Sequence, residues 1–172
     1  IVWNLLLLRH HGLRDVIINL HHRGDLIEKE LGDGSTVGMR ISYSHEPTIL
    51  GTGGGLKQAE RFFEGESFLV LNGDTLCDLD VGALCRFHRD ENPLATMVVG
   101  EDPDVDRWGA LELDAEQRVV RINGRGRVHD GGAGAREGDR AGDVAHAELA
   151  RVRGGIGVAL ALVDRAAGRE VG

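Results

Sequence analysis

Two short stretches hold the residues of this chain that are best suited to chemistry, GTGGGL at residues 51–56 and NGD at residues 72–74. Four glycines in six positions leave backbone without side chains, so that a ligand can lie directly against it. The acid of the second stretch, Asp74, carries a carboxylate, which is a hard oxygen ligand. The spacing raises the question of which ligand needs backbone so close, and whether Asp74 serves a ribose, a metal ion or neither.

The first interpretation of the glycine stretch is a dinucleotide site. Glycines that open a helix offer N–H groups to a pyrophosphate, and an acid about twenty residues later holds the ribose. Gly51, Gly53 and Asp74 follow that spacing. However, residues 46–50 separate the glycines from the preceding predicted strand, and Leu56 takes the place of the third glycine. The dinucleotide motif is therefore weak on its own.

The second interpretation is a cradle for a nucleoside, in which the base and the ribose lie against bare backbone. Thr52 would then cap the following helix or donate its hydroxyl to the ligand. In the third interpretation the glycines only reverse the chain. The acids of NGDTLCDLD, at residues 72–80, favour a ligand site over a plain turn.

Three acids, Asp74, Asp78 and Asp80, follow the apolar run at residues 68–71. A carboxylate at the end of a buried strand is poorly solvated unless a cation pairs with it. We therefore expect Asp74 to bind Mg²⁺ together with substrate phosphates. Asp78 and Asp80 stand just before a predicted helix, and we favour a capping role for both. Asp74 lies too early in the chain to cap that helix.

Four histidines occur as adjacent pairs, His10 with His11 and His21 with His22. Neighbouring side chains diverge on a helix or a strand, so we expect packed or solvated histidines rather than a metal cluster. The sequence contains no Ser-His-Asp or Cys-His arrangement that would indicate nucleophilic catalysis.

Apolar patterns predict the elements that position these residues. Residues 15–20 form a continuous β-branched run, typical of a strand covered on both faces in a parallel sheet. Further strands are expected at 39–46, 68–74 and 95–101, with a hairpin formed by 108–114 and 118–123 around residues 115–117. Helices are expected at 2–11, where we predict a buried helix, and at 21–34, 54–63 and 81–92.

Strands that alternate with helices imply a three-layer α/β fold with a mostly parallel sheet. In such sheets ligands gather beyond the carboxyl ends of the strands. The glycine stretch and NGD both fall on that predicted edge.

Composition narrows the class of protein. The net charge of −8 comes from mixed acids and bases without a basic stripe, so we expect no nucleic-acid partner. Cys77 and Cys85 form neither a disulfide framework nor a metal knuckle, which favours a reducing, cytoplasmic location. No apolar stretch is long enough to span a bilayer, so we expect no membrane partner.

The two ends of the sequence differ in character. The chain starts at Ile1, inside an apolar run without a cap residue, so we expect an N-terminal strand and loop to be missing. All seven aromatic residues lie before Asn123, whereas residues 124–172 hold twelve glycines. We therefore divide the chain into a domain at 1–123 and an atypical, poorly ordered Gly/Arg/Ala-rich tail at 124–172.

Four segments of the chain carry a resemblance to a known family. In chain order they are GLRDVIINLHHRGDLIEKELGDGSTVGMRISYSHEPTILGTGGGLKQA, FLVLNGDTLCDLD, FHRDENPLATMVV and RWGALELDAEQRVVRI. Because these segments occur in this order, residues 1–123 resemble the sugar-phosphate nucleotidyltransferases, the family of mannose-1-phosphate guanylyltransferases and N-acetylmuramate-1-phosphate uridylyltransferase. The resemblance implies a Rossmann-like nucleotidyltransferase fold. It also implies an enzyme that forms an NDP-sugar and pyrophosphate from an NTP and a sugar 1-phosphate.

The resemblance also assigns roles to residues. Asp74 matches the family's Mg²⁺-binding aspartate and is the catalytic and metal-binding candidate. Nucleotide-binding candidates lie around the glycine stretch, and Glu46 is the weaker one, for a base contact. Gly109, after Trp108, matches the glycine that approaches the sugar. The full nucleotide-binding set is Glu46, Thr52, Gly53, Gly54 and Gly55.

Parts of the family pattern do not occur in these 172 residues. The glycine-rich loop that grips the triphosphate, the lysine expected after residues 118–123 and a second metal aspartate have no match. We therefore expect this chain to be inactive as it stands. The alternative is a fragment that binds a nucleotide or an NDP-sugar without chemistry. Neither the base, the sugar nor the oligomeric state follows from the sequence.

Overall fold

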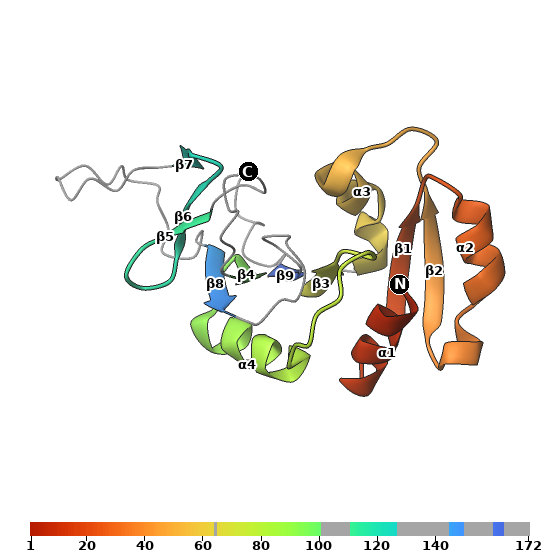
Figure 1. Ribbon diagram of the computed structural model, residues 1–172, viewed down its shortest axis with the longest axis horizontal. Coiled ribbons are helices and arrows are strands. Elements are labelled where there is room, and N and C mark those ends of the chain that lie inside the picture. Colours follow the sequence, from red (N-terminus) through yellow and green to blue (C-terminus); the bar gives the residue numbers. More distant parts are fainter. Residues whose placement is uncertain (64, 101–110, 127–144, 150–159, 164–172) are drawn as a thin grey trace. The chain divides into compact units, whose positions relative to one another are not determined.

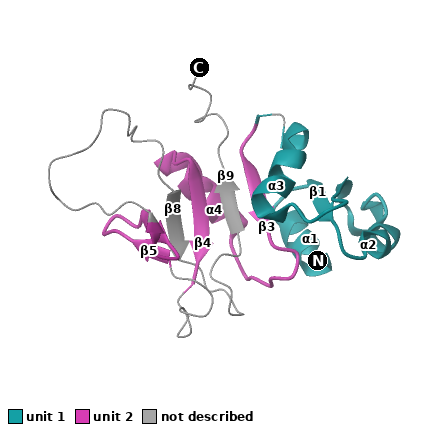
Figure 2. Cartoon of the chain, turned by 90° about the horizontal axis from the view of Figure 1, so that it is seen from above, with its two compact units in different colours: residues 1–65 teal, residues 66–172 magenta. Residues whose placement is uncertain are grey.

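The computed structural model of the 172-residue chain describes residues 1–63, 65–100, 111–126, 145–149 and 160–163. The chain divides into two compact units, residues 1–65 and residues 66–172, which Figure 2 distinguishes by colour. Within the described ranges, no helix is long and apolar enough to cross a membrane.

The first unit consists of short helices around two strands (Figure 1). Its elements are, in chain order, α1 (Val2–His10), β1 (Asp15–Leu20), α2 (Gly24–Leu31), the 3₁₀ turn η1 (Ser35–Val37), β2 (Arg40–His45), α3 (Gly51–Gln58) and the 3₁₀ turn η2 (Glu60–Phe63).

The strands β1 and β2 are parallel, and their register runs from Asp15 opposite Arg40 to Leu20 opposite His45. The parallel pairing of the two predicted strands is confirmed. Their carboxyl ends are level, so the segments that follow them, starting at His21 and Glu46, leave the pair at the same edge. Both views place α2 and α3 on opposite sides of the two strands (Figures 1 and 2).

Burial in the first unit is less complete than the sequence predicts. The helix α1 buries Leu5 and Leu8, but Trp3 is 72% exposed, so only one face of α1 is covered. In β1 only Leu20 is buried, and the other residues are half-buried or exposed. The predicted helix is confirmed, but it is buried on one face only.

The second unit is built on a four-stranded sheet with the strand order β3-β9-β4-β8. A separate three-stranded sheet has the order β5-β6-β7. The elements are β3 (Phe68–Leu71), α4 (Val81–Glu91), β4 (Ala95–Val99), β5 (Leu111–Leu113), β6 (Val119–Ile122), β7 (Arg125–Gly126), β8 (Ala145–Leu149) and β9 (Leu160–Val163).

Two strands of this sheet come from the region expected to be a tail. The strand β8 pairs in parallel with β4, whereas β9 lies between β3 and β4 and is antiparallel to both. The sequence analysis predicted no strand there. The division of the chain at residue 123 stays a prediction.

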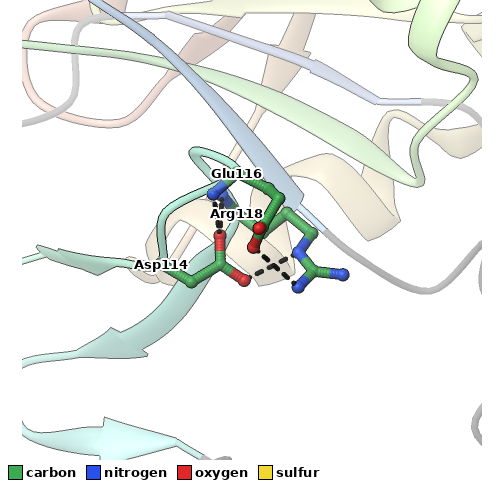
Figure 3. Close-up of polar contacts among 3 residues, drawn as sticks. All are labelled: Asp114, Glu116 and Arg118. Atoms are coloured by element: carbon green, nitrogen blue, oxygen red, sulfur yellow. Dashed lines mark hydrogen bonds and ion pairs between the residues drawn. The ribbon is translucent and has the colours of Figure 1, made fainter.

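The predicted hairpin is confirmed in its described part, where β5 and β6 pair antiparallel. Asp114 organises the turn, because its Oδ1 accepts hydrogen bonds from the backbone N–H groups of Glu116 (3.1 Å) and Arg118 (2.8 Å). The Nε of Arg118 donates to the second carboxylate oxygen of Asp114 at 2.7 Å (Figure 3). Local side-chain bonds of this kind are what favour Asp at turns.

Candidate functional site

The glycine stretch is helical from its first residue. The helix α3 begins at Gly51, whereas the sequence analysis expected a loop and a helix start near residue 54. Gly51 has φ +68°, a left-handed conformation that a side chain would strain. The glycines therefore form the first turns of α3 rather than a loop before it.

The start of α3 is capped by the side chain of Glu46 and not by Thr52. The cap residue is Leu50, which contributes no side-chain cap, and Thr52 lies exposed in the first turn. The Oε2 of Glu46 accepts the backbone N–H of Leu50 at 3.1 Å. A carboxylate at a helix N-terminus is favoured by the helix dipole. The predicted capping role of Thr52 is wrong, because α3 begins at Gly51 and Thr52 therefore lies inside the first turn and not at the N-cap position. The alternative, donation of the Thr52 hydroxyl to a ligand, stays a prediction.

Glu46 is held at both of its carboxylate oxygens. Its Oε1 accepts the side-chain amide of Asn19 at 2.8 Å, and the residue is only 9% exposed. The Leu50 N–H and then the Asn19 amide lower the pKa of Glu46, against the opposing effect of burial. Hydrogen bonds to the charged form have this effect on a carboxyl group. Glu46 is therefore a fixed anion between β1 and α3.

The glycines of α3 differ in the space around them. A Cβ on Gly55 would lie 2.1 Å from the Asn19 Nδ2 and 2.6 Å from the Glu46 Oε1, so no side chain fits. A Cβ on Gly54 would lie 2.7 Å from the Cβ of Leu50. A Cβ on Gly53 would meet nothing within 4 Å. Gly55 is thus required by packing inside the protein, whereas Gly53 offers bare backbone to the outside.

Two further contacts tie this region to β2. The Nδ1 of His21 lies 2.7 Å from the backbone oxygen of Glu46, and because a carbonyl only accepts, this nitrogen carries the proton. At the other end of α3, the Nε2 of Gln58 donates to the Ser44 Oγ and to the His45 oxygen, each at 2.8 Å. Both ends of α3 are therefore attached to the carboxyl end of β2.

The sequence analysis expected Asp74 at the end of a strand at 68–74, but β3 ends at Leu71 and Asp74 lies in the turn that follows. The backbone N–H of Thr75 donates to the Asn72 oxygen at 3.3 Å and closes this turn. Asp74 is exposed, so the expectation of a poorly solvated carboxylate is wrong, because the acid stands beyond the strand and faces solvent. An exposed carboxylate remains suitable for Mg²⁺, which keeps several waters and takes one or two protein carboxylates with substrate phosphates.

The other two acids separate into different roles. The Oδ1 of Asp80 accepts the backbone N–H of Ala83 at 2.9 Å, which confirms Asp80 as the cap of α4. Asp78 is exposed two residues before that cap and does not occupy the N-cap position.

The described residues contain no group of three or more His, Cys, Asp or Glu side chains placed to hold a metal ion. Asp74 belongs to the second unit and the glycine helix to the first, so their convergence on one ligand stays a prediction. Trp108 and Gly109, the predicted sugar-side residues, lie outside the described residues.

The sequence analysis missed Asn19. The signal was a single amide among the apolar residues of DVIINL at residues 15–20, although Asn19 itself is exposed in β1 and burial alone would not have required a partner. The partner, Glu46, is 27 residues away and could not be identified from the sequence.

Comparison with solved structures defines the class of protein. HddC from Yersinia pseudotuberculosis, solved as a complex with GMP-PN, superposes with a TM-score of 0.64 at 22% identity. The match covers 99% of this chain and 65% of that chain, and it shows a shared α/β fold.

The Nucleotidyl transferase family model matches residues 1–124. The chain belongs to this family. The mannose-1-phosphate guanylyltransferase of Mycobacterium tuberculosis is 34% identical over 109 residues, which are 63% of this chain and 30% of that protein. The N-acetylmuramate alpha-1-phosphate uridylyltransferase of Neisseria meningitidis is 45% identical over 82 residues, 47% of this chain and 36% of that protein. The chain thus spans about a third of the length of these relatives.

The names of the relatives bear on the interpretations of the glycine stretch, and its ligand stays a prediction. The relatives are named for nucleotidyl transfer to sugar 1-phosphates and not for dinucleotide chemistry. The geometry agrees, because residues 46–50 separate β2 from α3 and hold the capping acid Glu46.

Proposed function

We propose that this chain forms the nucleotide-binding part of an enzyme that makes an NDP-sugar and pyrophosphate from an NTP and a sugar 1-phosphate. The observation that carries the proposal is the start of α3, where backbone without side chains is fixed at the carboxyl end of a parallel strand pair. Ligands of open α/β sheets bind at this edge. Membership of the nucleotidyl transferase family supports the same function.

In this proposal the base and ribose lie against the open part of α3. Gly53 leaves the space next to its Cα empty, and the hydroxyl of Thr52 is in the same exposed turn. Gly55 and Glu46 face inward and fix the helix. A contact between Glu46 and the base stays a prediction, since each carboxylate oxygen can accept a second hydrogen bond.

The proposed reaction is an in-line displacement at the α-phosphorus of the NTP. An oxygen of the sugar 1-phosphate forms the new P–O bond, and the bond to the bridging oxygen of the β-phosphate breaks. Pyrophosphate leaves with that electron pair. Catalysis of such a step consists mainly of positioning and of neutralising charge.

Asp74 is the residue we propose to hold Mg²⁺, as an exposed carboxylate directly after β3. Bound there, the metal would neutralise charge on the α-phosphate. The chain's own contribution is to keep an oxygen ligand at the carboxyl end of a strand, in a short turn closed by the Asn72–Thr75 hydrogen bond.

Calorimetric titration of the chain with GTP and with UTP, each with and without Mg²⁺, tests the proposal. We expect binding that Mg²⁺ strengthens, and we expect Asp74→Asn to weaken the Mg²⁺-dependent part by at least about tenfold. Asp78→Asn is the matched control, because it removes an exposed charge four residues away and should leave binding unchanged. If Mg²⁺ does not change the affinity of the wild-type chain, or if both variants lose the same affinity, Asp74 is not part of the site.

The second candidate is a nucleotide-binding chain without chemistry. It is favoured by the same contacts at α3, which do not require a reaction. Release of pyrophosphate distinguishes the two candidates, because only nucleotidyl transfer produces it.

A further inference from the structure

We propose that Asn19 is a positioning residue, which fixes the first turn of α3 through the carboxylate of Glu46. The part of this proposal that concerns nucleotide rests on the proposed function, whereas the part that concerns α3 does not. Asn19 lies in β1, Glu46 directly follows β2, and Leu50 precedes α3. One chain of hydrogen bonds therefore connects the strand pair with the start of the helix.

The polarity of this chain of hydrogen bonds is determined by the Glu46 carboxylate. It can only accept, so both of its neighbours must donate. The Asn19 Nδ2 donates to Oε1 at 2.8 Å and the Leu50 N–H donates to Oε2 at 3.1 Å. Each oxygen is oriented by a different element, and rotation of the carboxylate would lose one of the two bonds.

The packing of Gly55 adds a second, independent observation. Its Cα lies so close to the Asn19–Glu46 pair that even a methyl group would overlap both side chains. Gly55 is buried one turn into α3, whereas Gly53 is exposed. The pair therefore determines the position of the inner face of α3, and with it the position of the bare backbone on the outer face.

The expected consequence is a residue that touches no ligand but changes ligand affinity. When the Asn19–Glu46 bond is lost, Leu50 loses a fixed acceptor and the first turn of α3 gains freedom. Ordering that turn again on binding would cost free energy. Affinity for a nucleotide should then fall more than global stability does.

An exchange of partners tests the proposal. Asn19→Asp places two carboxylates against each other, and Glu46→Gln leaves one of the two donors facing an NH₂ group. In the double variant the amide introduced at position 46 can donate to the carboxylate introduced at position 19 and still accept from the Leu50 N–H. The exchanged pair has the size and net charge of the wild-type pair, with the bond reversed. The double variant should therefore recover what each single change loses.

Two measurements compare the wild type, the two single variants and the double variant. Amide hydrogen exchange at Leu50 should accelerate by about tenfold in each single variant and return to within about threefold of wild type in the double variant. Dissociation constants for GTP and UTP, with Mg²⁺, should follow the same order, whereas a purely structural role would change the melting temperature without this recovery in affinity. If Asn19→Asp does not fold, Glu46→Gln and the double variant still give the comparison.

Lys57→Gln is the matched control, since it is a similarly small change in the same helix, at an exposed side chain that contacts Glu60. It should leave Leu50 exchange and nucleotide affinity unchanged. Additive losses in the double variant, or a Leu50 exchange rate that no variant alters, overturn the proposal. A wild-type chain that binds no nucleotide contradicts the proposed function instead, and Leu50 exchange then decides alone whether Asn19 positions α3.

Discussion

Single residues around α3 show that one sequence feature, a glycine run, serves more than one purpose. Gly51 adopts a left-handed backbone, Gly55 makes room for Asn19 and Glu46, and Gly53 has open space beside it. A motif match treats these glycines alike. The structure separates those that the fold needs from those available to a ligand, and this difference can be measured.

Replacing Gly55 by Ala should destabilise the chain by about 1–3 kcal/mol, because the new methyl group must displace two hydrogen-bonded side chains. Replacing Gly53 by Ala should stabilise it by up to about 1 kcal/mol, because Ala favours a helix and meets no neighbour. Denaturant unfolding measures both. If Gly53 contacts the nucleoside, Gly53→Ala should nevertheless weaken GTP or UTP binding. Equal effects on stability would contradict the distinction.

The ionisation of Glu46 should make part of the free energy of unfolding dependent on pH. Its pKa lies below the usual glutamate value of about 4.3, so its contribution is complete above that value and is lost as the pH falls through the lowered pKa. Glu46→Gln removes this titration. The stability difference between wild type and Glu46→Gln should therefore be constant near neutral pH and shrink below about pH 5. Denaturation midpoints at a series of pH values check this, and a difference that persists unchanged to about pH 3 would contradict it.

At the scale of elements, local sequence signals succeed where the bond that ends an element is itself local. Asp80 caps α4 through a backbone group three residues away, and Asp114 closes the β5–β6 turn through groups two and four residues away. The bond at the start of α3, from the Leu50 N–H to Glu46, is also local, but the Glu46 carboxylate is oriented by Asn19, which lies 27 residues away in β1.

Removing the α4 cap by Asp80→Ala should lower stability by about 1 kcal/mol, because the Ala83 N–H loses its acceptor. The control Asp78→Ala removes an exposed acid outside the N-cap position and should change stability by no more than about 0.5 kcal/mol. Thermal unfolding of both variants provides the comparison. The assignment of the cap would be wrong if the two substitutions cost the same.

At the scale of the whole molecule, the residues proposed for nucleotide and for metal belong to different compact units. The family match covers residues 1–124 and so includes residues of both. The chain also spans about a third of the length of these relatives.

We expect the chain to bind nucleotide without measurable turnover. The sequence has no match to the loop that the family resemblance assigns to the triphosphate, and without that grip the α-phosphate is poorly positioned for in-line attack. Pyrophosphate release can be followed with Mg²⁺, each NTP, and mannose, glucose or N-acetylmuramate 1-phosphates. A full-length mannose-1-phosphate guanylyltransferase provides the positive control. Robust Mg²⁺-dependent turnover by this chain would contradict the expectation.

The sequence alone determined the elements with strong local patterns, namely the strands β1 and β2, the Asp80 cap and the hairpin whose turn Asp114 closes. Each depends on periodicity or on a hydrogen bond a few residues long, which neighbouring residues specify. The order of motifs was also sufficient to indicate the family. The exposure of Asp74 and the one-sided burial of α1 were not predictable, because burial depends on what the rest of the chain covers.

Only the tertiary structure decided that α3 begins at Gly51, that Asn19 holds Glu46, and that β9 lies between β3 and β4. All three depend on partners brought together from distant positions in the chain. The Asn19–Glu46 bond crosses 27 residues, and nothing in the sequence near either residue specifies the other. Their proximity follows from the parallel pairing of β1 and β2, which brings two carboxyl ends to one edge.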